Sequence, residues 1–172
     1  MDLKTLESII RDVPDFPKPG IVFKDITPLL ANAEAFKATI DLMVARYQGS
    51  DLTKIVGVES RGFVFGAALA HALNLGLVLV RKPGKLPADT YSVSYALEYG
   101  TDTLEVHKDS FEPNDKVLVV DDLLATGGTA AATVELVRKA GGHVKEVAFL
   151  IELGFLDGRK KIAAPVHSWL NY

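Results

Sequence analysis

The sequence contains no cysteine, and only one tryptophan and two methionines occur among its 172 residues. Without cysteine the chain can form no disulfide bond and offers no thiolate nucleophile, which suits a reducing compartment and favours a cytoplasmic location. No apolar run approaches the roughly 20 residues that a membrane-spanning helix needs, so we expect no membrane contact. The first residues carry charges of both signs, unlike a secretory signal peptide.

The chain also has few histidines and no net positive charge. The four histidines lie far apart along the chain, at no spacing typical of metal ligands, so no structural zinc site is expected. Lysine and arginine number 19 against 22 acidic residues, and the net charge of −3 argues against non-specific binding to nucleic acid. The 48% hydrophobic and 24% charged content is typical of a globular protein, and the length predicts a single domain, residues 1–172.

The most informative segment is 117–129, Val-Leu-Val-Val-Asp-Asp-Leu-Leu-Ala-Thr-Gly-Gly-Thr. Its apolar, mostly β-branched start predicts a buried parallel strand that ends at Asp121 and Asp122. A loop of small residues follows, and an alanine-rich helix is predicted to begin near Thr129. Backbone N–H groups in such a loop and at a helix N-terminus bind anions, and Thr126 and Thr129 add hydroxyl donors. Because carboxylates repel an anion, the two acids fit either the hydroxyls of a neighbouring ribose or a divalent cation.

Other phosphate-binding motifs do not fit this segment. A Walker-type loop requires a lysine after its last glycine, and none follows Gly128. A dinucleotide fingerprint requires three spaced glycines, whereas this loop has only the Gly127-Gly128 pair. The remaining alternative is an ordinary strand–turn–helix. It is disfavoured because two adjacent acids at the end of a buried strand cost solvation free energy unless something uses them.

Short apolar strands alternate with helical stretches along most of the chain, which predicts an α/β fold with a doubly wound parallel sheet. The expected strands are residues 55–58, 77–80, 117–120 and 147–151. Helices are expected at 3–13 and 32–47, an antiparallel pair within 90–107, and a loop-rich tail over 154–172. Ligands of such sheets bind beyond the carboxyl ends of the strands, so the polar segments that follow three of them should form one cleft.

Basic residues follow two of these strands. Arg61 comes after the first, and Arg81, Lys82 and Lys85 come after the second. Together they could neutralise a highly anionic group such as pyrophosphate. The alternative for residues 81–85 is a solvated basic turn.

Residues 117–129 closely resemble the phosphoribosyl pyrophosphate (PRPP) motif of the type I phosphoribosyltransferases. The resemblance implies a twisted, mainly parallel sheet flanked by helices, with a small hood over the strand C-termini and a flexible antiparallel loop. The hood would be mainly 14–31 with part of the C-terminal tail, and the loop about 82–105. Asp121 and Asp122 would bind the ribose hydroxyls and act in catalysis. The 5′-phosphate would be held by Ala125, Thr126, Gly127, Gly128 and Thr129.

The same resemblance extends to the basic strand ends. It implies that the segment 59–62 contacts pyrophosphate and contains a cis peptide bond between Glu59 and Ser60. The implied pyrophosphate-binding residues are Ser60, Arg61, Arg81, Lys82, Lys85 and Tyr99.

Residues 19–30 resemble the hood of those family members that act on adenine. There the aromatic residue matching Phe23 stacks on the base, and backbone groups matching Val22 and Lys24 read its edge. An aliphatic residue matching Leu153 packs on the opposite face. Lys24 replaces a common arginine, which a backbone contact tolerates. A flat apolar slot with main-chain donors and acceptors can distinguish an amino from an oxo group. The alternative for Phe23 is a core aromatic residue.

Residues 97–100, Leu-Glu-Tyr-Gly, match the loop that closes over the site in this family. Closure excludes water, which would otherwise hydrolyse an activated sugar. Glu98 is the candidate for handling the proton of the base. The alternative is an exposed glutamate in a hairpin.

Taken together, the resemblance implies a purine-salvage transferase that moves the 5-phosphoribosyl group from PRPP to adenine, giving AMP and pyrophosphate. Mg²⁺ is implied as cofactor, held mainly by substrate oxygens and water, with Asp121 and Asp122 as the nearest protein groups. A homodimer is implied as well. The alternatives are a phosphoribosyltransferase for another purine and a non-catalytic PRPP-binding regulator, although no basic region for nucleic acid accompanies the domain.

Overall fold

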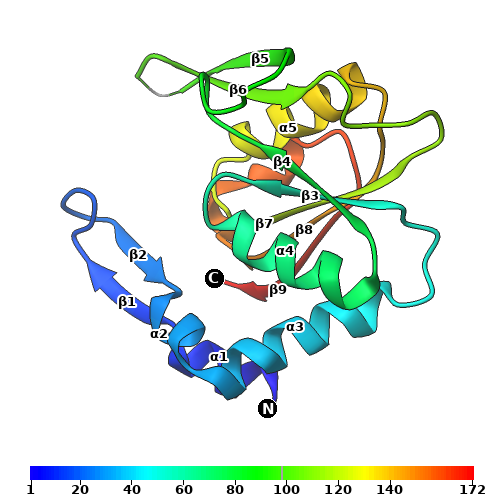
Figure 1. Cartoon of the computed structure of the whole chain (residues 1–172). Coiled ribbons are helices and arrows are strands. Elements are labelled where there is room, and N and C mark those ends of the chain that lie inside the picture. The colour runs from blue at the N-terminus through cyan, green and yellow to red at the C-terminus, as the bar shows by residue number, and fades with distance from the viewer. Residues whose placement is uncertain (98) are drawn as a thin grey trace. The chain divides into compact units, whose positions relative to one another are not determined.

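The computed structural model describes residues 1–97 and 99–172, so Glu98 lies outside the described residues. The chain divides into two compact units, Met1–Arg46 and Tyr47–Tyr172. The elements, labelled in Figure 1, are α1 (Leu3–Ile9), β1 (Arg11–Pro14), β2 (Val22–Asp25), α2 (Thr27–Ala31), α3 (Ala33–Tyr47), β3 (Lys54–Val58), α4 (Gly62–Leu73), β4 (Gly76–Val80), β5 (Thr90–Ala96), β6 (Thr101–His107), β7 (Lys116–Leu124), α5 (Gly128–Lys139), β8 (His143–Glu152), η1 (Gly154–Leu156), η2 (Gly158–Lys161) and β9 (Val166–Asn171). No helix within residues 1–97 and 99–172 is long and apolar enough to cross a membrane.

The first unit contains the predicted hood segment 14–31, which begins in a small antiparallel ribbon and ends in α2. Strands β1 and β2 pair antiparallel, with Val13 opposite Phe23. The Phe16 and Phe23 rings meet edge to face with centroids 5.3 Å apart. The helix predicted over 3–13 is wrong in its second half, because α1 ends at Ile9 and Arg11–Pro14 form β1. Residues 11–14 are extended because they pair with β2, and the helical spacing of apolar residues does not reveal this pairing.

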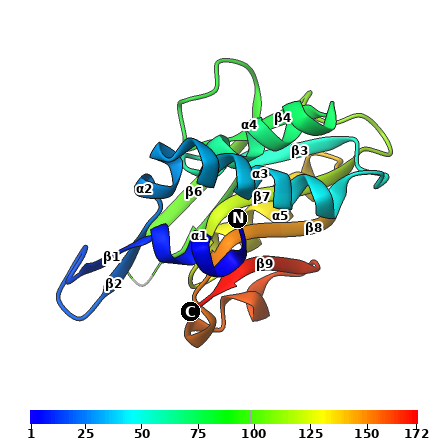
Figure 2. The same cartoon turned by 90° about the horizontal axis from the view of Figure 1, so that it is seen from below.

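The second unit is built on a five-stranded sheet in the order β4-β3-β7-β8-β9. All four strand pairs are parallel, as the alternation of strands and helices predicts. Figure 2 shows β3, β7, β8 and β9 side by side in this order. The carboxyl ends of the strands therefore lie along one edge of the sheet.

The two faces of this sheet are buried by different elements. Val56 and Val119 belong to a core cluster with residues of α5 and of the β5–β6 hairpin, such as Val134 and Leu104. Helix α4 packs against β3 and β7, with Phe65 and Leu69 fully buried. Burial on both faces explains why the strands are nearly continuous apolar runs rather than alternating sequences.

One predicted strand is longer than expected, and one strand was not predicted at all. β7 continues to Leu124, so Asp121 and Asp122 lie inside the strand rather than at its end, and Asp121 pairs with Phe149 of β8. The tail is more ordered than expected, because Val166–Asn171 form β9 beside β8. Most of β9 is only half-buried, and its sequence lacks the apolar run by which the other strands were recognised.

The antiparallel pair predicted within 90–107 is confirmed as the hairpin β5–β6. Tyr95 is paired with Asp102 across the hairpin, and Val93 is paired with Leu104. The hairpin packs along α5 (Figure 1), because Val93 and Leu104 point into the core on that side of the sheet.

Candidate functional site

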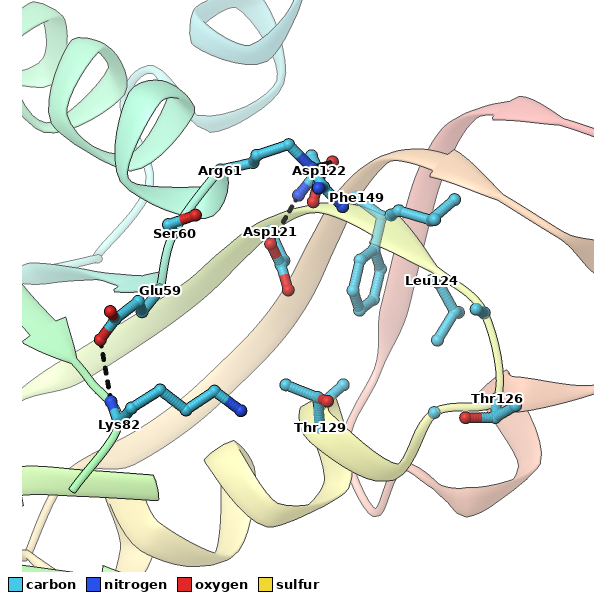
Figure 3. Close-up of a pocket in the computed structure, with 14 residues that line it drawn as sticks. Glu59, Ser60, Arg61, Lys82, Asp121, Asp122, Leu124, Thr126, Thr129 and Phe149 are labelled. Carbon is cyan, nitrogen blue, oxygen red and sulfur yellow. Dashed lines mark hydrogen bonds and ion pairs between the residues drawn. The ribbon is translucent and has the colours of Figure 1, made fainter. Parts of the chain in front are cut away.

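A cavity of about 320 Å³ lies at the carboxyl ends of β3 and β4 and beside the last residues of β7 (Figure 3). Its walls come from the three strand-end segments that the sequence analysis expected in one cleft. The lining residues are Glu59, Ser60, Arg61, Lys82, Asp121, Asp122, Leu123, Leu124, Ala125, Thr126, Gly127, Thr129, Ala130 and Phe149. Acidic residues, basic residues and a glycine loop therefore face the same space.

The two aspartates of β7 have different surroundings. Asp122 is 5% exposed, and its Oδ2 accepts a hydrogen bond from Nε of Arg61 at 2.5 Å. Among residues 1–97 and 99–172, no basic side chain forms an ion pair with Asp121. Its Oδ1 accepts the backbone N–H of Asp122 at 2.8 Å, and Figure 3 shows its side chain pointing toward the space above Thr129. Burial and the neighbouring Asp122 raise the pKa of Asp121 well above its ordinary value. Asp121 is thus a carboxyl group whose ionised form needs a positive partner.

A close approach between α4 and β7 brings Arg61 to Asp122. A Cβ atom on Gly62, the first residue of α4, would lie 2.8 Å from the backbone oxygen of Val120 and 2.9 Å from Oδ1 of Asp121. Only glycine allows the helix to start this near the acids. Gly62 lies in the segment 59–62 that was expected to contact pyrophosphate, but its spacing in the sequence does not indicate this contact with β7.

The loop from Ala125 to Gly127 leads from β7 into α5. Gly127 has φ of +85°, and no side chain caps the helix that begins at Gly128. The first N–H groups of α5 therefore remain available to an anion. Gly128 is not among the lining residues; a Cβ atom there would meet the ring of Tyr95 at 3.5 Å.

The back of this loop rests on Gly158, a residue that the sequence analysis did not single out. A Cβ atom on Gly158 would come within 2.2 Å of the backbone oxygen of Ala125, and one on Gly127 would come within 2.2 Å of the backbone oxygen of Gly158. The two backbones are therefore in direct contact. The only signal in the sequence is an Asp-Gly pair at 157–158, which by itself indicates a turn.

The residues predicted to bind pyrophosphate are only partly brought together. Ser60, Arg61 and Lys82 line the cavity, whereas Arg81, Lys85 and Tyr99 do not. Arg81 pairs instead with Glu59, with Nε and Oε2 3.3 Å apart, and Tyr99 is 83% exposed.

The side chain of Glu59, to which sequence reasoning gave no role, joins the two strand ends. Its carboxylate accepts the backbone N–H of Lys82 at 2.8 Å (Figure 3). This hydrogen bond, with the charge of Arg81, lowers the pKa of Glu59. The Glu59–Ser60 peptide bond is cis, as the resemblance implied.

The residues predicted to bind adenine lie in both compact units. Val22, Phe23 and Lys24 belong to β2 of the first unit, and Leu153 follows β8 in the second. Nζ of Lys24 lies 2.6 Å from Oδ1 of Asp12 on the neighbouring strand, so its side chain is engaged within the ribbon. The roles of these four residues stay predictions, as does that of Glu98, which lies outside the described residues.

The donor set of the cavity is compatible with a hard cation. Carboxylate oxygens of Asp121 and Asp122 are the type of ligand that Mg²⁺ prefers. Among residues 1–97 and 99–172, no three acidic or histidine side chains are grouped closely enough to hold a metal ion. The protein could therefore supply only part of a Mg²⁺ coordination shell, and the rest would come from substrate and water.

Known proteins resemble this chain over almost all of its length. A sequence model of the phosphoribosyl transferase domain matches residues 25–170. An adenine phosphoribosyltransferase of Geobacter metallireducens is 60% identical over 157 residues, which are 91% of this chain and 92% of that relative. The solved structure of adenine phosphoribosyltransferase from Thermoanaerobacter pseudethanolicus matches with a TM-score of 0.96 and 50% identity, covering 99% of this chain and 100% of that one. The Saccharomyces cerevisiae enzyme, solved with adenine and an imino-altritol bisphosphate, matches with a TM-score of 0.93 and 41% identity over 98% of both chains.

Proposed function

The chain belongs to the phosphoribosyl transferase domain family, and we infer that it transfers the 5-phosphoribosyl group of PRPP to adenine, giving AMP and pyrophosphate in purine salvage. The observation that carries this inference is the cavity in which an acid pair, basic residues and a glycine loop face one another. The relatives named above are adenine phosphoribosyltransferases that are 41–60% identical to this chain, and the two solved structures among them share its fold.

In the proposed reaction, N9 of adenine forms a bond to C1′ of the ribose while the bond from C1′ to the pyrophosphate oxygen breaks. The electron pair of the broken bond leaves with pyrophosphate. Adenine loses the proton that N9 carries before the reaction. Positive charge develops on the sugar and negative charge on the leaving group. Catalysis of this kind depends on positioning and on fixed charges rather than on a covalent nucleophile.

The charges of the cavity match this separation. Asp121 and Asp122 would hold the ribose hydroxyls and face the developing positive charge. Ser60, Arg61 and Lys82 would face the departing pyrophosphate from the cavity wall, and Arg81, Lys85 and Tyr99, which do not line the cavity, would join them when PRPP binds. A bound Mg²⁺ would neutralise further charge on the pyrophosphate oxygens.

The loop 125–129 would anchor the 5′-phosphate. Binding energy from this remote group fixes C1′ relative to the base, which is how non-reacting parts of a substrate accelerate a reaction. The uncapped start of α5 and the hydroxyls of Thr126 and Thr129 supply the donors.

Adenine would lie against Phe23 and Leu153, with its edge read by backbone groups of Val22 and Lys24. Glu98 is proposed to handle the proton of the base. The family resemblance also implies a homodimer that works in the cytoplasm; light scattering coupled to size-exclusion chromatography tests the dimer.

A panel of purines tests the proposed function. Adenine, hypoxanthine, guanine and xanthine are each incubated with PRPP, with and without Mg²⁺, and products are separated by chromatography. We expect AMP from adenine, dependence on Mg²⁺ and little product from the oxopurines. Preferred use of an oxopurine would overturn the assignment of adenine, and PRPP binding without any product would favour the regulator.

A further inference from the structure

A chain of polar side chains behind the cavity connects its two ends through the β5–β6 hairpin. Lys82 is ion-paired with Asp102 of β6, and Oδ2 of Asp102 also accepts a hydrogen bond from the Tyr95 hydroxyl at 3.3 Å. The Tyr95 hydroxyl lies 3.0 Å from Oγ1 of Thr129. Lys82 and Thr129 line the cavity, whereas Tyr95 and Asp102 do not. The two hairpin residues therefore contact the site only through others.

The hairpin places Tyr95 and Asp102 together by its register. They are directly paired across β5 and β6, and the hairpin is fixed to the core by Val93 and Leu104. The side chains of Lys82 and Asp102 are 40% and 27% exposed, so neither end of this ion pair is fully solvated. The hydrogen bond from Lys82 lowers the pKa of Asp102, which keeps the carboxylate ionised at neutral pH.

Lys82 needs such a partner because its side chain is long and flexible. An ammonium group already held by a carboxylate loses less conformational entropy when an anion binds in the cavity, so the anion binds more tightly. Figure 3 shows the Lys82 side chain extended toward the space above Thr129. This is the space on which the Asp121 side chain also converges.

The hydrogen bond between the hydroxyls of Tyr95 and Thr129 limits the directions in which Thr129 can donate. Each hydroxyl has one hydrogen to donate. Tyr95 can give its hydrogen either to Asp102 or to Thr129, but not to both. When Thr129 donates its own hydrogen to an anion in the loop, the Tyr95 hydroxyl turns its hydrogen from Asp102 to the oxygen of Thr129. Burial raises the pKa of Tyr95, so this hydroxyl retains its hydrogen at neutral pH.

We propose that Asp102 and Tyr95 are positioning residues of the transferase site: Asp102 holds the Lys82 ammonium for the pyrophosphate end of PRPP, and Tyr95 orients the Thr129 hydroxyl toward the 5′-phosphate. The proposal rests on the proposed function and assigns a role to the hairpin within it.

The Tyr95 half is tested with AMP, which carries the 5′-phosphate but no pyrophosphate. Calorimetry compares the wild-type protein with Tyr95→Phe, Thr129→Val and the double variant. The loss of one hydrogen bond should weaken AMP binding about fivefold in Tyr95→Phe. In the Thr129→Val background the same change should have no further effect, because Tyr95 acts through Thr129. Tyr91→Phe removes a hydroxyl from the same strand at a ring that contacts Lys108, and should bind AMP as the wild type does.

The Asp102 half is tested with steady-state kinetics. Asp102→Asn keeps the shape but removes the charge that holds Lys82, and should lower kcat/KM for PRPP about tenfold. Its affinity for AMP should fall less than its kcat/KM for PRPP, because AMP lacks the pyrophosphate that Lys82 is proposed to bind. In a Lys82→Met background, Asp102→Asn should add nothing. Thr103→Val, which removes the bond between Thr103 and Ser94 on the same hairpin, is the matched control.

The outcomes separate this proposal from the proposed function. Additive effects in both double-variant cycles, or wild-type behaviour of Tyr95→Phe and Asp102→Asn, would overturn the proposal alone. Equal losses of AMP and PRPP affinity together with a lower melting temperature would also overturn it, because the hairpin would then act only on the fold. A wild-type protein that neither binds AMP nor turns over PRPP would overturn the proposed function and this proposal with it.

Discussion

The guanidinium of Arg61 and the carboxylate of Asp122 form an ion pair with Nε and Oδ2 2.5 Å apart. This contact joins the end of β3 to β7 and leaves the two adjacent aspartates with unequal roles. Asp122 is neutralised by the protein itself, whereas Asp121 is ion-paired with no residue that the structure describes and has a raised pKa. The positive charge that Asp121 lacks is what a sugar cation or a metal ion would bring.

Replacement of either aspartate should impair PRPP use, but with different effects on stability. Asp121→Asn should lower kcat/KM for PRPP by about 100-fold or more, because a fixed charge near the transition state is removed. Asp122→Asn should also lower it, and should in addition reduce the free energy of unfolding by about 1–2 kcal/mol through loss of the bond to Arg61. Kinetics and thermal melting of both variants check this, with the exposed Asp109→Asn as control. Wild-type turnover by either variant would count against the assignment.

The raised pKa of Asp121 makes the ligand-free protein sensitive to pH. The folded protein holds this proton more tightly than the unfolded chain, whose carboxyl has the ordinary value of 3.8. The free energy of unfolding should therefore fall as pH rises from that value toward the raised pKa. Asp121→Asn has no such proton, so its melting temperature should exceed that of the wild type increasingly over this range. Calorimetry from acidic to neutral pH measures the difference, and parallel curves for the two proteins would refute the explanation.

The contact behind the glycine loop predicts an effect of Gly158→Ala on phosphate binding. The added methyl group would lie 2.2 Å from the backbone oxygen of Ala125, so the loop must move. Overpacking of this kind costs about 1–3 kcal/mol, and we expect AMP affinity to fall about tenfold or more. Gly154→Ala is the matched control, because its methyl group would meet the oxygen of Tyr172 at an ordinary 3.5 Å. Equal AMP affinity in the two variants would show that the contact does not shape the loop.

Glu152, at the end of β8, should support stability only above acidic pH. It is 7% exposed, and hydrogen bonds from Arg159 and Ser168 lower its pKa. The stabilisation is fully present above the ordinary value of 4.5 and is lost as pH falls below it. Glu152→Gln should therefore cost about 1–3 kcal/mol at neutral pH and progressively less in acid. Urea unfolding at several pH values checks this, and a cost independent of pH would contradict it.

Sequence alone predicts the parts of this fold whose signal is local. The apolar strand before Asp121, the glycine-containing loop and the β5–β6 hairpin each show a pattern within fewer than 20 residues, and all appear in the structure. The polar strand ends could be expected in one cavity because parallel strands end at one edge. The split of α1 and β1, the length of β7 and the presence of β9 depend on pairing with distant strands, which periodicity does not encode.

The residues that sequence reasoning missed are important because of their neighbours in the folded structure and not because of their residue type. Gly158 matters because its backbone lies against Ala125, 33 positions earlier in the numbering. Glu59 matters because it accepts the N–H of Lys82, and Tyr95 because it reaches Thr129. A glutamate, a tyrosine or a glycine at these positions has no spacing that would reveal such partners.

A crystal structure with AMP and pyrophosphate tests most directly whether this cavity divides the charges of the reaction as proposed. We expect the 5′-phosphate on residues 125–129, the ribose hydroxyls at Asp121 and Asp122, and pyrophosphate beside Arg61 and Lys82. A ribose far from both aspartates, or a glycine loop without an anion while nucleotide is bound elsewhere, would contradict the account.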